Sequence, residues 1–410
     1  MTSSVANRRT VAIVGAGPAG LMAAEVIASA GHAVTVYDRM ASPARKFLMA
    51  GRGGLNLTHS EPLEEMLARY PSDASFIRQA VTAFPPGKLI AWAEGLGQQT
   101  FKGSSGRIFP KAMKASPMLR SWLKRLDALG VVLKTQHAWT GFAKNGAITF
   151  AIAGGAEHTL KPDAVVLALG GASWPRLGAD GSWVPILSSA GVDVTPLAPA
   201  NCGVLVRWSD LFVNRFAGAP LKRIAITLSG TTRRGEAVVT RTGLEGGVIY
   251  GLGPQVRMAL PSGLVDLAVD LKPDMTAAAL IERLSRPRGS QSQTNFLRKA
   301  LSLDAAAIGL MREAGPFPTE PEAVARLTKA LPLQIYGTSG LARAISTAGG
   351  VRFDGLSPNF MLTAHPGVFV AGEMLDWDAP TGGYLLQAAF ATGHAAGLGV
   401  LDRLKTSAAK

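Results

Sequence analysis

A glycine-rich turn near the N-terminus has the spacing of a site that binds a dinucleotide. Gly15, Gly17 and Gly20 form the pattern G-x-G-x-x-G, and Asp38 follows about 20 residues later. The first glycine would permit a tight turn, the second a close approach of backbone to pyrophosphate, and the third close packing of helix on strand. The helix N-terminus would attract the phosphates, and Asp38 would accept hydrogen bonds from a ribose. The predicted contacts of this clamp are Gly15, Ala16, Gly17, Pro18, Ala19, Gly20 and Asp38.

The elements that must hold this clamp are indicated by hydrophobic runs on either side of it. The predicted elements are a strand over 11–14, an Ala-rich helix over 20–30, a strand over 33–37 and a buried parallel strand within 163–171. The last of these runs ends in Gly170 and Gly171, which predicts a further glycine turn beside the nucleotide.

A second glycine motif lies near the C-terminus. A predicted strand over 367–370 leads into Ala371-Gly372-Glu373, and Thr381-Gly382-Gly383 precedes a predicted helix over 384–397. A domain that binds NAD alone would not need this second motif, whereas two-part FAD domains close over the ribityl chain and ring in this way. The predicted fold is therefore α/β, with a Rossmann-like FAD-binding domain built from both ends of the chain.

The composition limits the classes of protein and partner. The 42 Lys and Arg residues against 28 Asp and Glu residues give a net charge of +14, which fits a phosphorylated cofactor, a nucleic acid such as RNA or an acidic surface as partner, or solubility alone. A single cysteine, Cys202, excludes an intrachain disulfide, favours the cytoplasm and is expected to be a buried packing thiol. The six histidines lack metal-ligand spacing, so no metal site is predicted. No uninterrupted apolar run reaches about 18 residues, so no membrane span is predicted.

Longer segments carry a resemblance to a known family. They are 50–60 (AGRGGLNLTHS), 106–115 (GRIFPKAMKA), 169–181 and 349–397, which includes the stretch from Gly372 to Gln387. With them, the chain resembles the BaiN/RdsA-type NAD(P)/FAD-dependent oxidoreductases over nearly its whole length. The resemblance implies FAD as the redox centre and a discontinuous FAD-binding domain with an insertion. Beyond the clamp, the predicted FAD contacts are Arg39, Lys46, Gly53, Gly54, Asn56, Gly170, Gly171, Gly372, Glu373, Gly382, Gly383 and Tyr384.

Two departures from the family pattern mark a divergent subgroup. Relatives usually read G-G-G-R-C-N-x-T-N near the flavin, whereas this chain reads GRGGLNLTH over 51–59, without Arg and Cys at their usual places. Asn56 and Thr58 keep the pattern, so this loop is still expected beside the isoalloxazine ring. The later motif T-G-G-Y-N-L-Q is TGGYLLQ over 381–387, which loses an Asn.

The middle of the chain is expected to form the insertion. Short β runs at 202–206, 224–228 and 237–239, separated by turns, predict a small barrel or sandwich. Helical spacing at 276–284, 305–313 and 320–330, with a polar link over 285–295, predicts helices that cap it. The predicted boundaries are an FAD-binding domain over 1–198 and 345–410, a β-rich domain over 199–271 and a helical segment over 272–344.

Polar residues near the expected flavin loops are the candidates for catalysis. Flavin N5 itself accepts or donates hydride, so the protein needs to add only binding, orientation and a proton donor. The candidates are Tyr384, Asp376, Arg107, Lys111 and His59. Tyr384 and Asp376 could transfer protons, Arg107 and Lys111 could hold an anionic substrate or the electron-rich edge of the flavin, and His59 follows the ring loop.

The sequence leaves several functions open. The first is an FAD-dependent oxidoreductase that acts on a small molecule by hydride transfer at flavin N5, reducing an activated C=C bond or oxidising an amine. The second is an RNA-modifying flavoenzyme that reduces uridine to dihydrouridine in ribosomal RNA, as one branch of the resembled family does. A third is a flavin-bound sensor or assembly factor. No second G-x-G-x-x-G follows the first, so NADPH or NADH as electron donor would dock transiently.

Overall fold

The computed structural model describes residues 8–408 and divides into two compact units. One unit holds the residues up to Ala198 and those from Ser346 onward, and the other spans Pro199–Ile345. Each unit has its own buried hydrophobic core. Within residues 8–408, none of the helices combines the length and apolar character needed to cross a bilayer.

The first unit is built on a five-stranded parallel sheet. Its strands, in spatial order, are β19 (Val368–Val370), β10 (Ala164–Leu167), β1 (Thr10–Val14), β2 (Ala33–Tyr37) and β6 (Val132–Lys134). The short apolar runs of β1 and β10 are buried almost throughout, as expected for central strands covered on both faces. Because all five strands are parallel, the loops after their carboxyl ends gather along one edge of the sheet.

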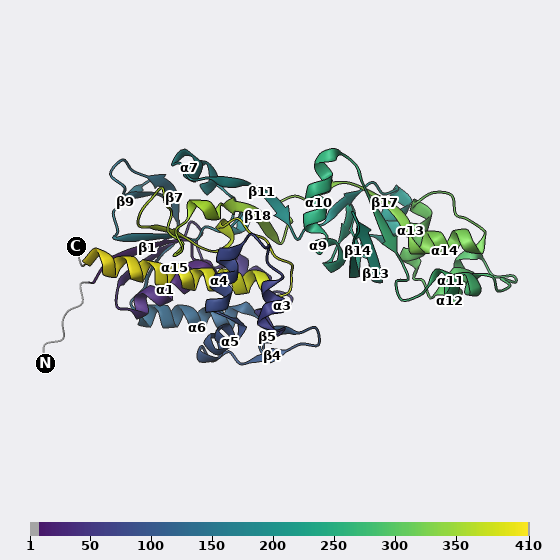
Figure 1. Ribbon diagram of the computed structural model, residues 1–410, viewed down its shortest axis with the longest axis horizontal. Coiled ribbons are helices and arrows are strands. Elements are labelled where there is room, and N and C mark those ends of the chain that lie inside the picture. Colours follow the sequence, from purple (N-terminus) through teal and green to yellow (C-terminus); the bar gives the residue numbers. More distant parts are fainter. Residues whose placement is uncertain (1–7, 409–410) are drawn as a thin grey trace. The chain divides into compact units, whose positions relative to one another are not determined.

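Helices α1 (Pro18–Ser29) and α15 (Tyr384–Ala408) pack closely against each other, although they come from opposite ends of the chain (Figure 1). Glycines on α15 permit this approach: a Cβ atom on Gly393 would lie 2.2 Å from the carbonyl oxygen of Ala19, and one on Gly397 would lie 2.9 Å from Cβ of Val26. Helix α15 begins where the sequence predicts it, at Tyr384, and continues beyond the predicted end at 397 to Ala408.

Smaller elements complete this unit. Its other helices are α2 (Arg45–Ala50), α3 (Leu63–Leu67), α4 (Ser75–Ala83), α5 (Pro86–Gly95), α6 (Ala115–Ala128) and α7 (Trp183–Ser189). Its small sheets are β3 (Thr58–His59) with β5 (Arg107–Pro110) and β4 (Thr100–Lys102), and β7 (His137–Phe142) with β8 (Ile148–Ile152) and β9 (Glu157–Leu160). Strands β11 (Val194–Ala200) and β18 (Ser346–Val351) pair where the chain passes between the units.

The second unit is a closed six-stranded barrel with helices against it. The barrel order is β12 (Val204–Val206), β15 (Gly243–Glu245), β14 (Thr231–Val239), β13 (Pro220–Leu228), β16 (Val265–Asp270) and β17 (Leu331–Thr338). Its helices are α8 (Asp210–Phe216), α9 (Gly247–Tyr250), α10 (Gly253–Ala259), α11 (Ala277–Leu284), α12 (Gln293–Leu301), α13 (Ala305–Glu313) and α14 (Pro321–Lys329). Together the two units confirm the predicted α/β class, with a Rossmann-like parallel sheet and an inserted barrel.

Two details of the insertion differ from the sequence expectation. The stretch 272–344, expected to be helical, also contains β17, whose alternating buried and exposed residues close the barrel between β12 and β16. The polar link expected over 285–295 gives way at Gln293 to helix α12, which the Ser292 side chain caps by accepting a hydrogen bond from the Asn295 N–H.

Candidate active site

The glycine motifs predicted from opposite ends of the chain meet at the carboxyl edge of the parallel sheet. Gly15 follows β1 and Asp38 follows β2, while Gly170 and Gly372 follow β10 and β19. Gly372 has a φ of +80°, and a Cβ atom there would lie 2.9 Å from that of Ala19 on α1. The second motif therefore lies directly against the N-terminal turn of the helix that the first motif opens.

The three glycines of the clamp have different surroundings. Gly15 has a φ of +105°, and a Cβ atom on it would lie 2.2 Å from the carbonyl oxygen of Ala168. A Cβ atom on Gly20 would lie 1.9 Å from the carbonyl oxygen of Gly15. Gly17 instead has no atom within 4 Å of its Cβ position, just before Pro18, the first residue of α1. Packing therefore requires Gly15 and Gly20, while Gly17 leaves open space at the start of α1.

Asp38 is held at the end of β2 by backbone amides. Its carboxylate accepts hydrogen bonds from the N–H groups of Ala16 and Met40, each at 2.8 Å. Burial raises the pKa of Asp38, and these hydrogen bonds and nearby arginines oppose that rise only in part. Its neighbour Arg39 forms an ion pair with Asp180. The acid thus sits beside the glycine turn, where a ribose diol would meet it.

Lys46 and Glu373 form an ion pair between the two halves of the predicted cofactor site. The Lys46 Nζ atom lies 2.6 Å from Oε2 of Glu373 and also donates a hydrogen bond to the Ser173 hydroxyl. Glu373 accepts further hydrogen bonds from the backbone N–H groups of Thr347 at 3.0 Å and Gly171 at 3.4 Å. Predicted contacts from three distant segments are therefore joined in one polar network.

The loop expected beside the flavin ring touches the TGGY turn. Gly53 is exposed with open space at its Cβ position, and Gly54 has a φ of +104°. The Oδ1 atom of Asn56 is buried and has no hydrogen-bond partner. A Cβ atom on Gly383 would lie 2.6 Å from the carbonyl carbon of Thr58, so only glycine permits this contact. The orphaned Asn56 oxygen is the kind of group that a ligand N–H would satisfy.

Gln387, the last residue of the TGGYLLQ motif, fixes this contact from inside. Its buried side chain accepts a hydrogen bond from the Thr58 hydroxyl at 2.7 Å and donates one to the Phe84 carbonyl at 2.6 Å. Gly382, with a φ of +138°, begins the turn that leads into α15. The motif therefore fastens the ring loop to the start of α15.

Tyr384, the first residue of α15, lies in a cluster of polar and aromatic side chains. Its buried ring stacks on His59, with ring centroids 5.6 Å apart and an angle of 23° between the planes. Burial, together with the nearby carboxylate of Glu61, raises the pKa of Tyr384 to about 12. The Tyr70 hydroxyl donates to the Tyr384 carbonyl oxygen at 2.9 Å. At neutral pH the Tyr384 side chain is thus a neutral phenol.

Glu61 links this cluster to Arg69. The Glu61 carboxylate accepts hydrogen bonds from Arg69 at 2.9 Å and 3.4 Å, and its Oε2 atom lies 3.8 Å from Nδ1 of His59. Sequence reasoning missed Glu61, Arg69 and Tyr70, because they belong to no motif. The only signal was the position of Glu61 two residues after His59 in the ring loop.

The structure does not bring the other catalytic candidates into this cluster. Arg107 pairs with His59 across β3 and β5, but its side chain is exposed. Lys111 donates a hydrogen bond to the Gln99 side chain at 2.8 Å. Asp376 accepts a hydrogen bond from the Thr195 hydroxyl, which ties it to β11.

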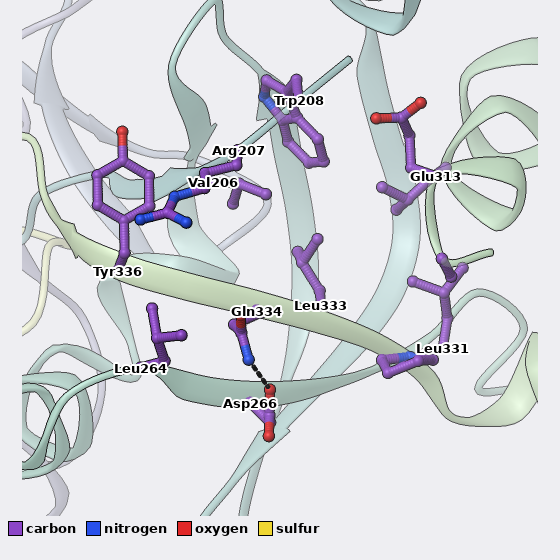
Figure 2. Close-up of a pocket in the computed structure, with 13 residues that line it drawn as sticks. Val206, Arg207, Trp208, Leu264, Asp266, Glu313, Leu331, Leu333, Gln334 and Tyr336 are labelled. Atoms are coloured by element: carbon purple, nitrogen blue, oxygen red, sulfur yellow. Dashed lines mark hydrogen bonds between the residues drawn. The ribbon is translucent and has the colours of Figure 1, made fainter.

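A separate pocket of about 350 Å³ lies in the barrel unit (Figure 2). Its walls include the apolar residues Val206, Leu331 and Leu333, and the side chain of Gln334 donates to Asp266 at 3.1 Å. Figure 2 shows the Arg207 guanidinium beside the Tyr336 ring, and its central carbon lies 5.4 Å from the ring centroid. None of the predicted site residues lines this pocket.

Comparison with known proteins decides the family. Residues 9–399 match the model of the HI0933-like protein Rossmann domain, which is nearly the whole chain. The chain belongs to the HI0933-like family. It is 27% identical to a 3-dehydro-bile acid delta(4,6)-reductase from Clostridium scindens, over 96% of this chain and 99% of that protein. It is 25% identical to a ribosomal RNA dihydrouridine synthase from Haemophilus influenzae, over 95% of this chain and 97% of that protein.

Solved structures agree on the fold of this HI0933-like protein. A 3-ketosteroid delta1-dehydrogenase from Sterolibacterium denitrificans superposes with a TM-score of 0.50 at 12% identity, covering 97% of this chain and 100% of that one. At this identity the likeness concerns the fold alone. The family to which this chain belongs is one of FAD-dependent oxidoreductases.

The site geometry fits such a cofactor. The open space at Gly17 lies at the N-terminus of α1, where backbone N–H groups lack acceptors within the helix and the helix dipole favours phosphate. The half-buried carboxylate of Asp38 lies beside it, and the unpartnered oxygen of Asn56 lies in the ring loop. These features are suited in turn to a pyrophosphate, a ribose and the polar edge of a flavin.

Proposed function

We propose that this protein reduces a C=C bond conjugated to a carbonyl group in a small molecule. The names of the two relatives support this choice. A delta(4,6)-reductase and a dihydrouridine synthase both add hydrogen across a C=C bond, although their substrates differ in size and chemistry. The shared part of the reaction therefore transfers to this chain more readily than either substrate.

In this proposal, the residues at the edge of the parallel sheet hold FAD. The amides after Gly15 and at the start of α1 bind the pyrophosphate, Asp38 binds the adenosine ribose, and Asn56 contacts the ring. The Lys46–Glu373 pair and the Gly372 turn face the part of the cofactor between them. When bound and reduced, the flavin supplies hydride to the substrate.

The observation that carries the proposal is the buried, protonated phenol of Tyr384 at the contact between the ring loop and the TGGY turn. Hydride addition to a conjugated C=C bond leaves a carbanion-like carbon that must gain a proton. In the proposed step, the Tyr384 O–H bond breaks, the proton joins that carbon, and the phenol oxygen keeps the electron pair until water returns a proton. Amine oxidation consumes no proton, so it gives this phenol no comparable task.

The remaining catalytic candidates receive smaller parts in this proposal. His59 supports the Tyr384 ring by stacking on it. Arg107, exposed on the strand next to His59, is available to an anionic or carbonyl group of a substrate. Lys111 and Asp376 are bonded to Gln99 and Thr195, and we assign them no part in the reaction.

The test is anaerobic and uses purified holoprotein. NADPH and then NADH are added while the flavin absorbance is followed, after which conjugated ketones such as steroid enones are offered as acceptors. The proposal predicts bleaching by a reduced nicotinamide and reoxidation by the enone. Tyr384→Phe should keep the bleaching and slow reoxidation by about 10²–10⁴-fold, whereas Tyr336→Phe on the barrel should leave both steps unchanged. Dithionite-reduced protein that no enone reoxidises would refute it.

A second candidate substrate is uridine in ribosomal RNA. The net charge of +14 and the likeness to a ribosomal RNA dihydrouridine synthase favour it. The same reduced protein is mixed with ribosomal RNA that lacks dihydrouridine. Reoxidation by RNA with formation of dihydrouridine, and none by enones, would replace the small-molecule substrate with RNA while leaving the role of Tyr384 in place.

A further inference from the structure

The segment 99–114 concentrates positive charge beside the ring loop. It contains no acidic residue and four cations, Lys102, Arg107, Lys111 and Lys114. All four are exposed, and the Lys111 Nζ atom donates to the uncharged side chain of Gln99, so its charge stays available. An exposed group of cations without acids attracts an anion. The chemistry proposed at Tyr384 uses at most one of them, Arg107.

Strand pairing divides these cations between the two faces of the small sheet. Side chains alternate along β5, so Arg107 and Phe109 share one face with Lys111, which follows the strand. Ile108 belongs to the other face and is buried. Lys102 of β4 pairs with Ile108 and therefore lies on that other face too. One face thus carries a cation, an aromatic ring and a second cation in a row.

The aromatic part of this face is a pair of phenylalanines. Phe101 of β4 lies directly opposite Phe109 of β5, and their rings stack with centroids 5.8 Å apart and 29° between the planes. The Phe101 side chain is 39% exposed, which leaves a flat apolar surface on which a base could stack. We refer to Arg107, Phe109, Phe101 and Lys111 as the basic aromatic face.

The basic aromatic face is continuous with the proposed catalytic centre. His59, whose ring stacks on the proposed proton donor, pairs directly with Arg107 across β3 and β5. A Cβ atom on Gly54, in the ring loop, would lie 3.7 Å from the Phe109 ring. At about 3.3 Å per residue, Lys111 lies about 13 Å beyond Arg107 along the chain direction of β5. A ligand that begins at the ring loop therefore meets Arg107 first and Lys111 last.

We propose that the basic aromatic face docks NADPH, which delivers its hydride to the flavin. This inference rests on the proposed function, which needs a reductant and places FAD beside the ring loop. The nicotinamide lies at the ring loop, Arg107 binds the pyrophosphate, the adenine stacks on Phe101, and the 2′-phosphate meets Lys111. The C4–H bond of the dihydronicotinamide breaks, its hydride carries both electrons to flavin N5, and NADP⁺ leaves before the enone enters.

Charge and size favour this dinucleotide over other anions. NADPH carries phosphate at two separate places, the pyrophosphate and the ribose next to adenine, and the basic aromatic face has two cations separated by one stacking platform. Single-stranded RNA is bound by several successive stacking side chains along a basic groove, whereas this face offers a single platform. NADH lacks the 2′-phosphate and leaves Lys111 without an anion, so we expect the protein to prefer NADPH.

The experiment measures equilibrium binding of NADP⁺ and NAD⁺ to the FAD-loaded protein by calorimetry, so it needs no turnover. Lys111→Gln should weaken NADP⁺ binding about tenfold, the loss of one hydrogen bond to a charged group, and leave NAD⁺ binding within about twofold. Arg107→Gln should weaken both ligands about tenfold, and Phe101→Ala should weaken both by about 5–100-fold. Lys102→Gln, the same change of charge on the opposite face, is the matched control and should change neither by more than about twofold.

Three outcomes would overturn the inference. The first is wild-type protein that binds NADP⁺ no more tightly than NAD⁺, and the second is a Lys111→Gln effect no larger than that of Lys102→Gln. The third is a ribosomal RNA fragment whose binding Arg107→Gln and Phe101→Ala weaken, in a protein that does not bind NADP⁺.

The proposed function is tested separately, because reoxidation of dithionite-reduced protein by an enone does not require a nicotinamide donor. Reoxidation by the enone together with any of the three outcomes would refute only the docking of NADPH. The expected binding pattern in a protein that no enone reoxidises would support the docking and refute the proposed function instead.

Discussion

Gly17 allows cofactor binding to be separated from folding. Its backbone has a φ of −84° and a ψ of 179°, which any residue can adopt, and its Cβ position has no neighbour within 4 Å. Substituting Gly17→Ala therefore strains nothing in the protein itself. The added methyl group would occupy the space at the start of α1 that we assign to the FAD pyrophosphate.

The structure sets the size of both effects. Replacing an N-cap glycine by alanine costs up to about 1 kcal/mol of helix stability, and the reduced freedom of the unfolded chain returns about 0.4–1 kcal/mol, so the net change is within about 1 kcal/mol in either direction. A hydrogen bond to a charged group contributes about 1.5–3 kcal/mol. If the methyl group displaces the phosphates from two amides, the loss of about 3–6 kcal/mol weakens FAD binding by roughly 10²–10⁴-fold.

The assay compares FAD affinity, by equilibrium dialysis of apoprotein, with the free energy of unfolding of the same apoprotein in urea. Gly87→Ala, an exposed glycine of α5 that also has open space at its Cβ position, is the matched control and should change neither affinity nor fold. Gly15→Ala should instead prevent stable folding, because its Cβ atom would lie 2.2 Å from a carbonyl oxygen. Gly17→Ala apoprotein that binds FAD within about threefold of wild type would refute the assignment of the pyrophosphate to this turn.

Three further predictions concern stability. The side chain of Glu25 is 13% exposed and accepts hydrogen bonds from Trp92, Trp122 and Arg125. Glu25→Ala should therefore lower the free energy of unfolding in urea by about 3 kcal/mol, and a loss below about 1 kcal/mol would contradict this. Gln387→Leu leaves the Thr58 hydroxyl and the Phe84 carbonyl without their partner, so we expect a loss of about 2–4 kcal/mol, with thermal unfolding as the measurement. Burial acts to raise the pKa of Glu61, but its hydrogen bonds with Arg69 and its nearness to Tyr384 outweigh burial and hold that pKa below its ordinary value of 4.5. The stability that Glu61 contributes is therefore present above pH 4.5 and lost as the pH falls through the lower folded value, so Glu61→Gln should lose less stability on acidification than wild type.

The strands beside the clamp could be predicted from the sequence because their signals are local. A buried parallel strand is a short apolar run, and a glycine turn follows it directly, so β1, β2 and β10 were expected close to their observed bounds. The packing in the structure also gives Gly15 and Gly20 the close contacts that their spacing implied. At these positions the structure that the local sequence predicts is also the one that the tertiary packing requires.

Strand β17 and the Glu61 cluster could not be predicted, because their causes are not local. The alternation in β17 follows a helical stretch, and only closure of the barrel between β12 and β16 explains it. Glu61 and Arg69 have ordinary residue types and spacing, and Glu61 is buried near Tyr384, which comes more than 300 positions later in the chain. A contact between residues so far apart in the chain cannot be predicted from one sequence alone.

The departures from the family pattern and this cluster occur at the same place in the molecule. The family pattern that the ring loop resembles implies an Arg, a Cys and a final Asn, whereas this chain lacks that Arg and Cys and carries His59 at the final position. In the structure, that imidazole stacks on Tyr384 and holds the backbone of Glu61. An Asn side chain could accept the same backbone hydrogen bond but would offer no ring to the phenol. In the proposed function, the divergent loop thus supports, through His59, the phenol that we propose as the proton donor.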